Sequence, residues 1–162
     1  TCLAKYGAKS ALGAECIKEK IRETNILKYG SPFPRLYRYM YNNIKFDSSW
    51  ELIFYLYWVD KDVKIEREPF PIEYVFNNTL HLYYPDFLVD GQLYEIKGDH
   101  FFEDGKMINP YDRSLDELSE AKYQCAIQHN VTFITSAEIS FYRDYVLKTY
   151  GEEIINEHLI KM

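Results

Sequence analysis

The dipeptide Asp90-Gly91 constrains the fold of this chain more than any other short stretch. Both residue types tolerate the positive φ angles of a two-residue hairpin turn, and strand-forming residues flank them on both sides. Such a turn fixes the register of its strands, so the facing pairs follow by counting outward. The predicted pairs are Val89 with Gln92, Leu88 with Leu93, Phe87 with Tyr94, and Asp86 with Glu95.

This register sorts the hairpin side chains onto two faces, because opposed residues and residues two apart along a strand share a face. Asp86, Glu95 and Lys97 therefore lie on one face. Two carboxylates held roughly 5 Å apart repel by about 3 kcal/mol at an effective dielectric of about 20. A divalent cation relieves this repulsion, and Mg²⁺ is typically held by one or two carboxylates together with water. The opposite face is apolar and comprises Pro85, Phe87, Val89, Tyr94 and Ile96.

Helix and strand signals alternate on both sides of the hairpin. Asp47-Ser48-Ser49 is a helix start signal, and Ser114-x-x-Glu117 is another. The order helix, strands, helix, strand indicates an α/β domain with a mixed sheet flanked by helices. The predicted helices are 50–58, 114–129 and 137–148, with more helix after Gly151; the predicted strands are 63–67, 72–76, 79–89, 92–98 and 131–135; and a loop is predicted over 99–113.

The first part of the chain differs from the rest in charge. Residues 1–46 carry a net charge of +6, although the whole chain of 162 residues carries −6. Within this part, Thr1–Gly7 recurs as Thr24–Gly30 with Thr, Lys, Tyr and Gly at the same positions, and a helix is predicted over 14–28. Either the chain begins inside a series of repeats, as a piece of a longer protein, or it begins at Thr1 after loss of an initiator Met.

We divide the chain into a basic helical arm, residues 1–34, and a body, residues 35–162, joined at the helix-breaking Ser31–Pro34. A basic arm on an acidic body is expected where one part meets phosphates, although Lys and Arg also simply solvate surface helices. The basic and aromatic stretch 35–41 either contacts nucleic acid or packs its tyrosines on the body. The candidate DNA-binding residues are Lys5, Lys18, Lys20, Arg22, Lys28, Arg35 and Arg38.

Cysteine usage and hydropathy bear on the compartment. The three cysteines are widely spaced and include no CxxC, which favours a reducing compartment over a disulfide framework or a zinc site. No apolar run has the length of a membrane span, and no signal-peptide pattern is present. We therefore expect no membrane association and a cytoplasmic location.

The hairpin motifs resemble a known family. Tyr84-Pro85-Asp86-Phe87 followed by Tyr94-Glu95-Ile96-Lys97-Gly98 is similar to the signature of the PD-(D/E)xK nuclease superfamily. The resemblance implies a restriction-endonuclease-like core in α-β-β-β-α-β order. It further implies that Asp86, Glu95 and the carbonyl of Ile96 bind the catalytic Mg²⁺, or Mn²⁺ in its place, and that Lys97 orients or activates the attacking water.

Two further residues match positions that often assist in this superfamily. Glu51 corresponds to an acidic residue on the helix before the strands, which adds to the catalytic and metal-binding set, and Lys122 corresponds to a Lys or Gln on the helix after them. Each has a structural alternative: Ser48-x-x-Glu51 is also a capping box, and Lys122 is also placed to extend past apolar neighbours to solvent.

The resemblance implies a metal-dependent endonuclease acting on duplex DNA. The Lys-Tyr-Gly repeats are similar to modules of phage-borne and homing endonuclease-like proteins, which points to a site-directed enzyme in a bacterial or phage-infected cell. A double-strand break then requires a homodimer or two sequential nicks. The alternatives are a catalytically inactive DNA-binding protein of the same fold, and a resolvase, repair nickase or restriction enzyme.

Overall fold

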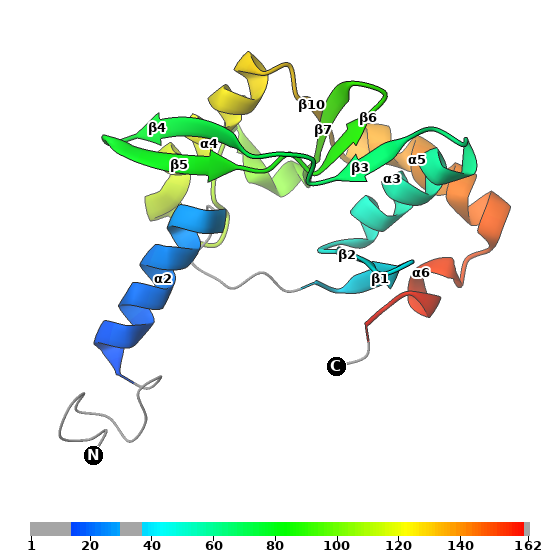
Figure 1. The fold of residues 1–162 in the computed structure, drawn as a ribbon, viewed down its shortest axis with the longest axis horizontal. Coiled ribbons are helices and arrows are strands. Elements are labelled where there is room, and N and C mark those ends of the chain that lie inside the picture. The colour runs from blue at the N-terminus through cyan, green and yellow to red at the C-terminus, as the bar shows by residue number, and fades with distance from the viewer. Residues whose placement is uncertain (1–13, 30–36, 161–162) are drawn as a thin grey trace.

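The computed structural model describes residues 14–29 and 37–160, which form a mixed α/β structure (Figure 1). Its main sheet has four strands in the order β10-β7-β6-β3. Strand β10 runs parallel to β7, and the other neighbours are antiparallel. The strands are β3 (Ile65–Arg67), β6 (Phe87–Val89), β7 (Gln92–Ile96) and β10 (Thr132–Ile134).

Helices cover both faces of this sheet. The larger core joins α3 (Ser49–Asp60) and α5 (Ser136–Tyr150) to one face, whereas α4 (Asp116–Gln128) packs with Leu93 and Phe133 on the other. Along the chain, α3, β3, β6, β7, α4 and β10 follow the order α-β-β-β-α-β. The expectation of a mixed sheet flanked by helices is therefore confirmed.

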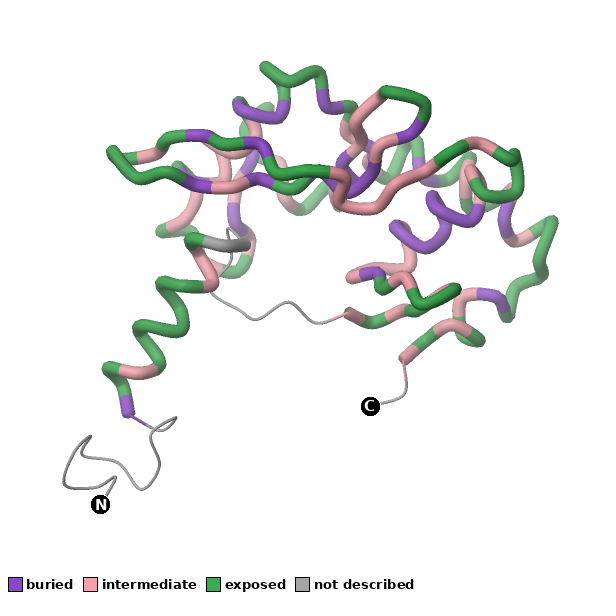
Figure 2. The backbone as a smooth tube through the Cα atoms, viewed as in Figure 1, coloured by how far each residue is buried: buried purple, intermediate pink, exposed green. Residues whose placement is uncertain are grey.

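Helix α3 is the centre of the larger core. Residues 51–56 are all buried, so the helix is covered on every side rather than along one stripe (Figure 2). The ring of Phe54 has its centroid 5.3 Å from that of Phe87, 5.2 Å from Tyr94 and 4.9 Å from Tyr142. The aromatic residues that are so frequent in the sequence thus tie α3 to the sheet and to α5.

Three of the four predicted pairs form, with Phe87 opposite Tyr94, Leu88 opposite Leu93 and Val89 opposite Gln92. The fourth prediction, Asp86 opposite Glu95, is wrong, because the ladder of β6 and β7 ends at Phe87 and Tyr94 and the Asp86 side chain accepts from the Ile96 N–H instead. Asp90 and Gly91 have φ angles of 46° and 84°, as a two-residue turn of this kind requires.

One strand prediction is wrong in its extent. The predicted strand 79–89 is two strands, β5 (Thr79–Tyr83) and β6, and Asp86 lies just before β6 rather than inside a strand. Strand β5 pairs with β4 (Ile72–Phe76) in a separate two-stranded ribbon. The break has a physical cause, because Pro85 has no N–H to donate to a neighbouring strand.

Short elements complete the described structure, several of them in the predicted loop. Tyr39 and Tyr41 pack against the larger core, so for these two residues the packing alternative is correct. The elements are α2 (Glu15–Tyr29), β1 (Tyr39–Tyr41), β2 (Ile44–Phe46), α6 (Ile154–Glu157), the 3₁₀ helices η2 (Asp99–Phe101) and η3 (Arg113–Leu115), and the strands β8 (Phe102–Glu103) and β9 (Lys106–Met107).

Helix α2 of the arm lies against the body, where Ile26 packs against the second core beside β5. Arg22 forms an ion pair with Asp112, and most other described side chains of α2 are exposed. Over the described ranges, no helix combines the length and apolar character that crossing a membrane requires.

The turn gives a first testable prediction. Gly91→Ala should destabilise the protein by about 1 kcal/mol, because a Cβ is unfavourable at a positive φ angle. Gly91→Asn should cost less, because Asn adopts this conformation more readily. Urea unfolding monitored by circular dichroism measures both, and an alanine variant as stable as the parent would contradict the turn geometry.

Candidate active site

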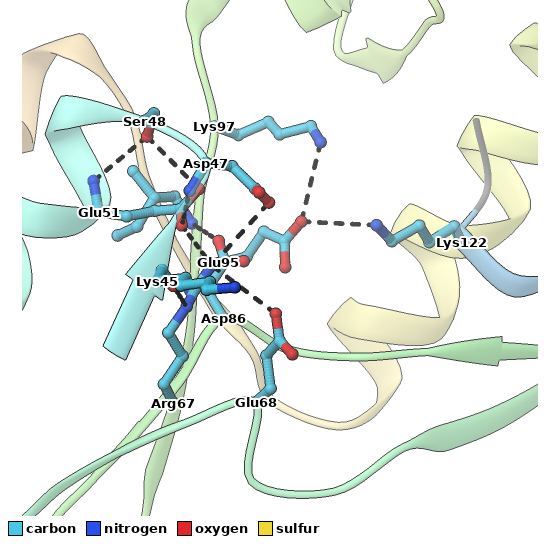
Figure 3. A network of polar contacts seen from close by, with 11 residues as sticks. Lys45, Asp47, Ser48, Glu51, Arg67, Glu68, Asp86, Glu95, Lys97 and Lys122 are labelled. Atoms are coloured by element: carbon cyan, nitrogen blue, oxygen red, sulfur yellow. Dashed lines mark hydrogen bonds and ion pairs between the residues drawn. The ribbon is translucent and has the colours of Figure 1, made fainter. Parts of the chain in front are cut away.

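The carboxylate of Asp86 lies at the end of the hairpin opposite the turn, where β6 and β7 stop pairing. It is buried, and its Oδ2 accepts a hydrogen bond from the backbone N–H of Ile96 at 2.7 Å (Figure 3). In a continued ladder this N–H would pair with the carbonyl of residue 85. The side chain of Asp86 therefore ends the ladder and is held in place by β7.

The backbone carbonyl of Ile96 points toward the same place. The next N–H, that of Lys97, donates to Ile134 in β10 at 2.9 Å. Because the peptide is trans, the Ile96 carbonyl points away from β10, on the side of Asp86. Its partner in a regular ladder would be the N–H of residue 85, which Pro85 lacks. The Pro-Asp pair thus provides an acidic side chain and also keeps a carbonyl available.

Glu95 is 4 % exposed and lies on the sheet face covered by α4. Its Oε2 accepts a hydrogen bond from the hydroxyl of Tyr83 at 2.9 Å. Its Oε1 lies 3.8 Å from the Nζ atom of Lys97 and 3.6 Å from that of Lys122, as Figure 3 shows. The predicted grouping of Glu95 with Lys97 on one face is confirmed, and the Lys122 side chain also points inward to this group.

Burial and charge shift the pKa values of this group. Burial, and then the charges of Glu95 and Glu51, raise the pKa of Asp86 well above its usual value, although Arg67 and the Ile96 N–H act in the opposite direction. Burial and the neighbouring Lys122 lower the pKa of Lys97. Burial and then Glu95 raise the pKa of Tyr83, which keeps its hydroxyl a neutral donor.

Glu51 serves as part of the start of α3. Its backbone N–H donates to Ser48 Oγ at 3.2 Å, and its Oε2 accepts from the N–H of Asp47 at 3.1 Å. The same Oε2 lies 2.6 Å from Nη2 of Arg67. Ser48 therefore caps α3, and the Glu51 carboxylate bonds to the backbone at the helix start through the N–H of Asp47, so this half of the predicted capping box is shifted by one residue. The predicted role of Glu51 as a metal ligand stays a prediction.

Arg67 is a residue of this site that the sequence analysis missed. Its side chain is only 7 % exposed and lies against the rings of Phe46 and Phe87, at 5.2 and 5.4 Å from their centroids. Its Nε donates to the carbonyl of Lys45 at 2.6 Å. The sequence did indicate that Arg67 is buried. Arg67 lies two residues after Ile65 in a strand, so both side chains are on the same face of the sheet, and that of Ile65 packs against the larger core.

The donors present fit one hard divalent cation. Asp86, Glu95 and the Ile96 carbonyl supply oxygen ligands, and Mg²⁺ keeps several waters when few protein ligands are available. The raised pKa of Asp86 shows that its negative charge lacks full compensation in the protein alone. Within residues 14–29 and 37–160, no three or more His, Cys, Asp or Glu side chains are grouped to hold an ion by themselves.

The predicted DNA-binding residues fall partly inside and partly outside the described part of the chain. Lys18 pairs with Glu15 at 2.6 Å, Arg22 pairs with Asp112, and Lys20 and Arg38 are exposed. The residues outside the description are Lys5, Arg35 and the side chain of Lys28, together with the first copy of the repeat. DNA binding by these residues stays a prediction.

Comparison of the chain with protein-family models, with curated proteins and with solved structures finds no significant match.

The buried charge of Asp86 gives a pH-dependence prediction for the metal-free protein. Because its pKa in the folded state is raised, Asp86 stabilises the fold most below about pH 4, and this contribution is lost as pH rises through the folded-state pKa. In a chelating buffer at pH 7, Asp86→Asn should be more stable than the parent, and this advantage should disappear at pH 4. Thermal unfolding at both pH values measures it.

The exposed Asp144 of α5 provides the matched control, and Asp144→Asn should change stability little at either pH. A less stable Asp86→Asn variant at pH 7 would contradict the proposed charge balance.

Arg67 gives a further prediction. Arg67→Met should destabilise the protein by about 3–5 kcal/mol, because it leaves the buried Glu51 carboxylate without the guanidinium. Adding Glu51→Gln should recover part of this loss, so the two changes are not additive. Urea unfolding of the single and double variants measures the coupling. Arg143→Met, on the exposed face of α5, is the control, and equal losses for the two arginines would refute the ion pair.

Proposed function

We propose that this chain is a Mg²⁺-dependent DNA endonuclease with a restriction-endonuclease-like core, of the site-directed kind found in phage-borne and homing enzymes. The observation that carries the proposal is the grouping of two buried carboxylates, Asp86 and Glu95, with the ammonium groups of Lys97 and Lys122. This combination of acidic and basic groups suits a cation and a phosphodiester together.

Each group has a distinct role in this proposal. Asp86, Glu95 and the Ile96 carbonyl would hold the ion, which when bound would supply positive charge at the phosphate and make water more acidic. Lys97 would hold the attacking water by a hydrogen bond, and the Phe101 ring, whose centroid lies 4.3 Å from its Nζ atom, helps to keep this side chain in place. Attack of the water oxygen on phosphorus, in line with the 3′ oxygen, would form the new P–O bond and break the P–O3′ bond. The water would lose one proton and the leaving 3′ oxygen would gain one from solvent, which gives a 5′-phosphate and a 3′-hydroxyl.

The basic arm supports DNA as the substrate. Residues 1–46 carry a net charge of +6, and a basic segment that neutralises phosphates releases counterions. Binding to duplex DNA is then strongly dependent on salt. One metal site cuts one strand, so a double-strand break requires a homodimer or two sequential nicks.

One observation favours a second candidate, a catalytically inactive DNA-binding protein of the same fold. Glu95 already lies within 4 Å of two ammonium groups, so the cluster has partial internal compensation. Thermal unfolding tests whether the site holds a metal ion, because an ion that binds the folded state raises its melting temperature, and cleavage then separates the candidates. Mg²⁺ or Mn²⁺ stabilises the parent but not Asp86→Ala if the site holds metal.

The cleavage prediction concerns Lys97. Lys97→Ala should lower the rate of plasmid cleavage in Mg²⁺ by about 100-fold or more, the usual loss when a group that moves or holds a proton is removed. Affinity for duplex DNA, measured by fluorescence anisotropy in a chelating buffer, should change little. Lys64→Ala removes an exposed lysine and should cleave at the parental rate.

Asp86→Ala should be inactive in the same assay, which controls for contaminating nucleases. Full activity of Lys97→Ala would overturn the assignment of the site. Metal-induced stabilisation without any cleavage of linear, branched or single-stranded DNA would instead support the inactive candidate.

A further inference from the structure

A cavity of about 180 Å³ adjoins the candidate active site. Lys97 and Lys122, whose ammonium groups both approach Glu95, also line this cavity. The rest of its wall comes from α4, from Tyr74 of β4 and from the segment 101–111. It is smaller than the roughly 300–1,000 Å³ clefts that accept drug-sized ligands, so it suits one ring of a larger molecule, with the rest of that molecule at its edge.

The charge of the wall favours an anion. Among the described residues that line the cavity, the charged side chains are Lys97 and Lys122, and no carboxylate is included. Glu95 lies within 4 Å of both ammonium groups and the charge of Asp86 also acts on Lys97, but neither carboxylate lines the cavity, so the charges that an anion in the cavity meets are positive. A phosphate oxygen at the wall would find two donors within reach of one another.

The remainder of the wall favours a flat ring. Phe101 and Tyr111 present aromatic rings whose centroids lie 5.9 Å apart, and Ile108 and Leu118 add aliphatic surface. Tyr111 is 69 % exposed although it is large and aromatic. An exposed aromatic ring beside basic side chains is the arrangement on which bases of single-stranded nucleic acids stack.

Asn109 adds a polar group to the same wall. It is buried, and its Oδ1 accepts hydrogen bonds from the backbone N–H groups of Tyr111 and Asp112 at 3.1 and 3.0 Å. The Nδ2 group is therefore the part of this side chain that can donate to a ligand. Because these two hydrogen bonds hold the Asn109 amide in place, its Nδ2 group is suited to donate a hydrogen bond to the edge of a base.

We propose that the cavity receives one unpaired nucleotide of a DNA strand, with its phosphate at Lys97 and Lys122 and its base against Tyr111 and Phe101. This inference deepens the proposed function and rests on it for the identity of the strand. Because Lys97 belongs to both sites, the nucleotide in the cavity adjoins the phosphodiester that is cut. A base held there cannot remain paired and stacked, so the preferred substrate has an unpaired nucleotide at the cleavage position.

The cavity is tested first without metal or cleavage, by isothermal titration calorimetry in a chelating buffer. Deoxyadenosine monophosphate should bind more tightly than inorganic phosphate or deoxyadenosine alone, because it uses both the ammonium groups and the rings. Tyr111→Ala should weaken this binding roughly tenfold, as expected for loss of one stacking ring. Phe141→Ala, an exposed aromatic on α5, is the control and should bind like the parent.

The second measurement uses DNA. An oligonucleotide with 2-aminopurine at an unpaired position should lose fluorescence on binding, and Tyr111→Ala should reduce this loss. In Mg²⁺, a duplex with a one-nucleotide bulge should be cut at least tenfold faster than the fully paired duplex, and Tyr111→Ala should remove the difference.

The outcomes separate this inference from the proposed function. Equal cleavage of bulged and paired duplexes, unaffected by Tyr111→Ala, would overturn the inference and leave the nuclease proposal standing. Tyr111-dependent binding of the nucleotide and of the oligonucleotide without cleavage would support the cavity and overturn the nuclease proposal. Equal binding of phosphate, nucleoside and nucleotide would overturn the cavity assignment itself.

Discussion

Burial of like charge at the end of one β-hairpin is the constraint on which the candidate site depends. Asp86 and Glu95 are both buried, and the charge of Glu95 helps to raise the pKa of Asp86. Buried carboxylates are tolerated only when hydrogen bonds or opposite charges compensate them. The two carboxylates are compensated by different partners. Asp86 accepts a hydrogen bond from a backbone N–H, whereas Glu95 accepts one from the Tyr83 hydroxyl and lies near two ammonium groups.

The arginine that the sequence analysis missed extends this compensation to the helix. Arg67, at the end of β3, places its guanidinium against Glu51 at the start of α3, and its charge also acts on Asp86. A guanidinium is planar, always charged and weakly hydrated, so it suits a buried position between aromatic rings better than an ammonium does. The contact between Arg67 and Glu51 joins β3 to the start of α3. Because β3 pairs with β6, the residues that cap α3 are linked in this way to the site.

Much of the hairpin followed from the sequence because its determinants are local. Asp90-Gly91 fixes the register, and the register places Glu95 and Lys97 on one face. The break before Asp86 was missed because strand-forming residues flank it, although Pro85 carried the signal. The buried pairing of Arg67 was missed because it depends on residues distant in the chain. The cavity was missed for the same reason, since α4, β4 and the segment 101–111 form it only after folding.

Lys97 and Lys122 connect the two parts of the proposed mechanism. In the protein alone both ammonium groups lie within 4 Å of Glu95 Oε1, at distances longer than a good charged hydrogen bond. A divalent cation on Asp86 and Glu95 would compensate that carboxylate more strongly than either ammonium does. The two lysines would then be available to an anion in the adjoining cavity, which they also line. Metal binding and phosphate binding are in this way coupled through one carboxylate, and by linkage each would strengthen the other.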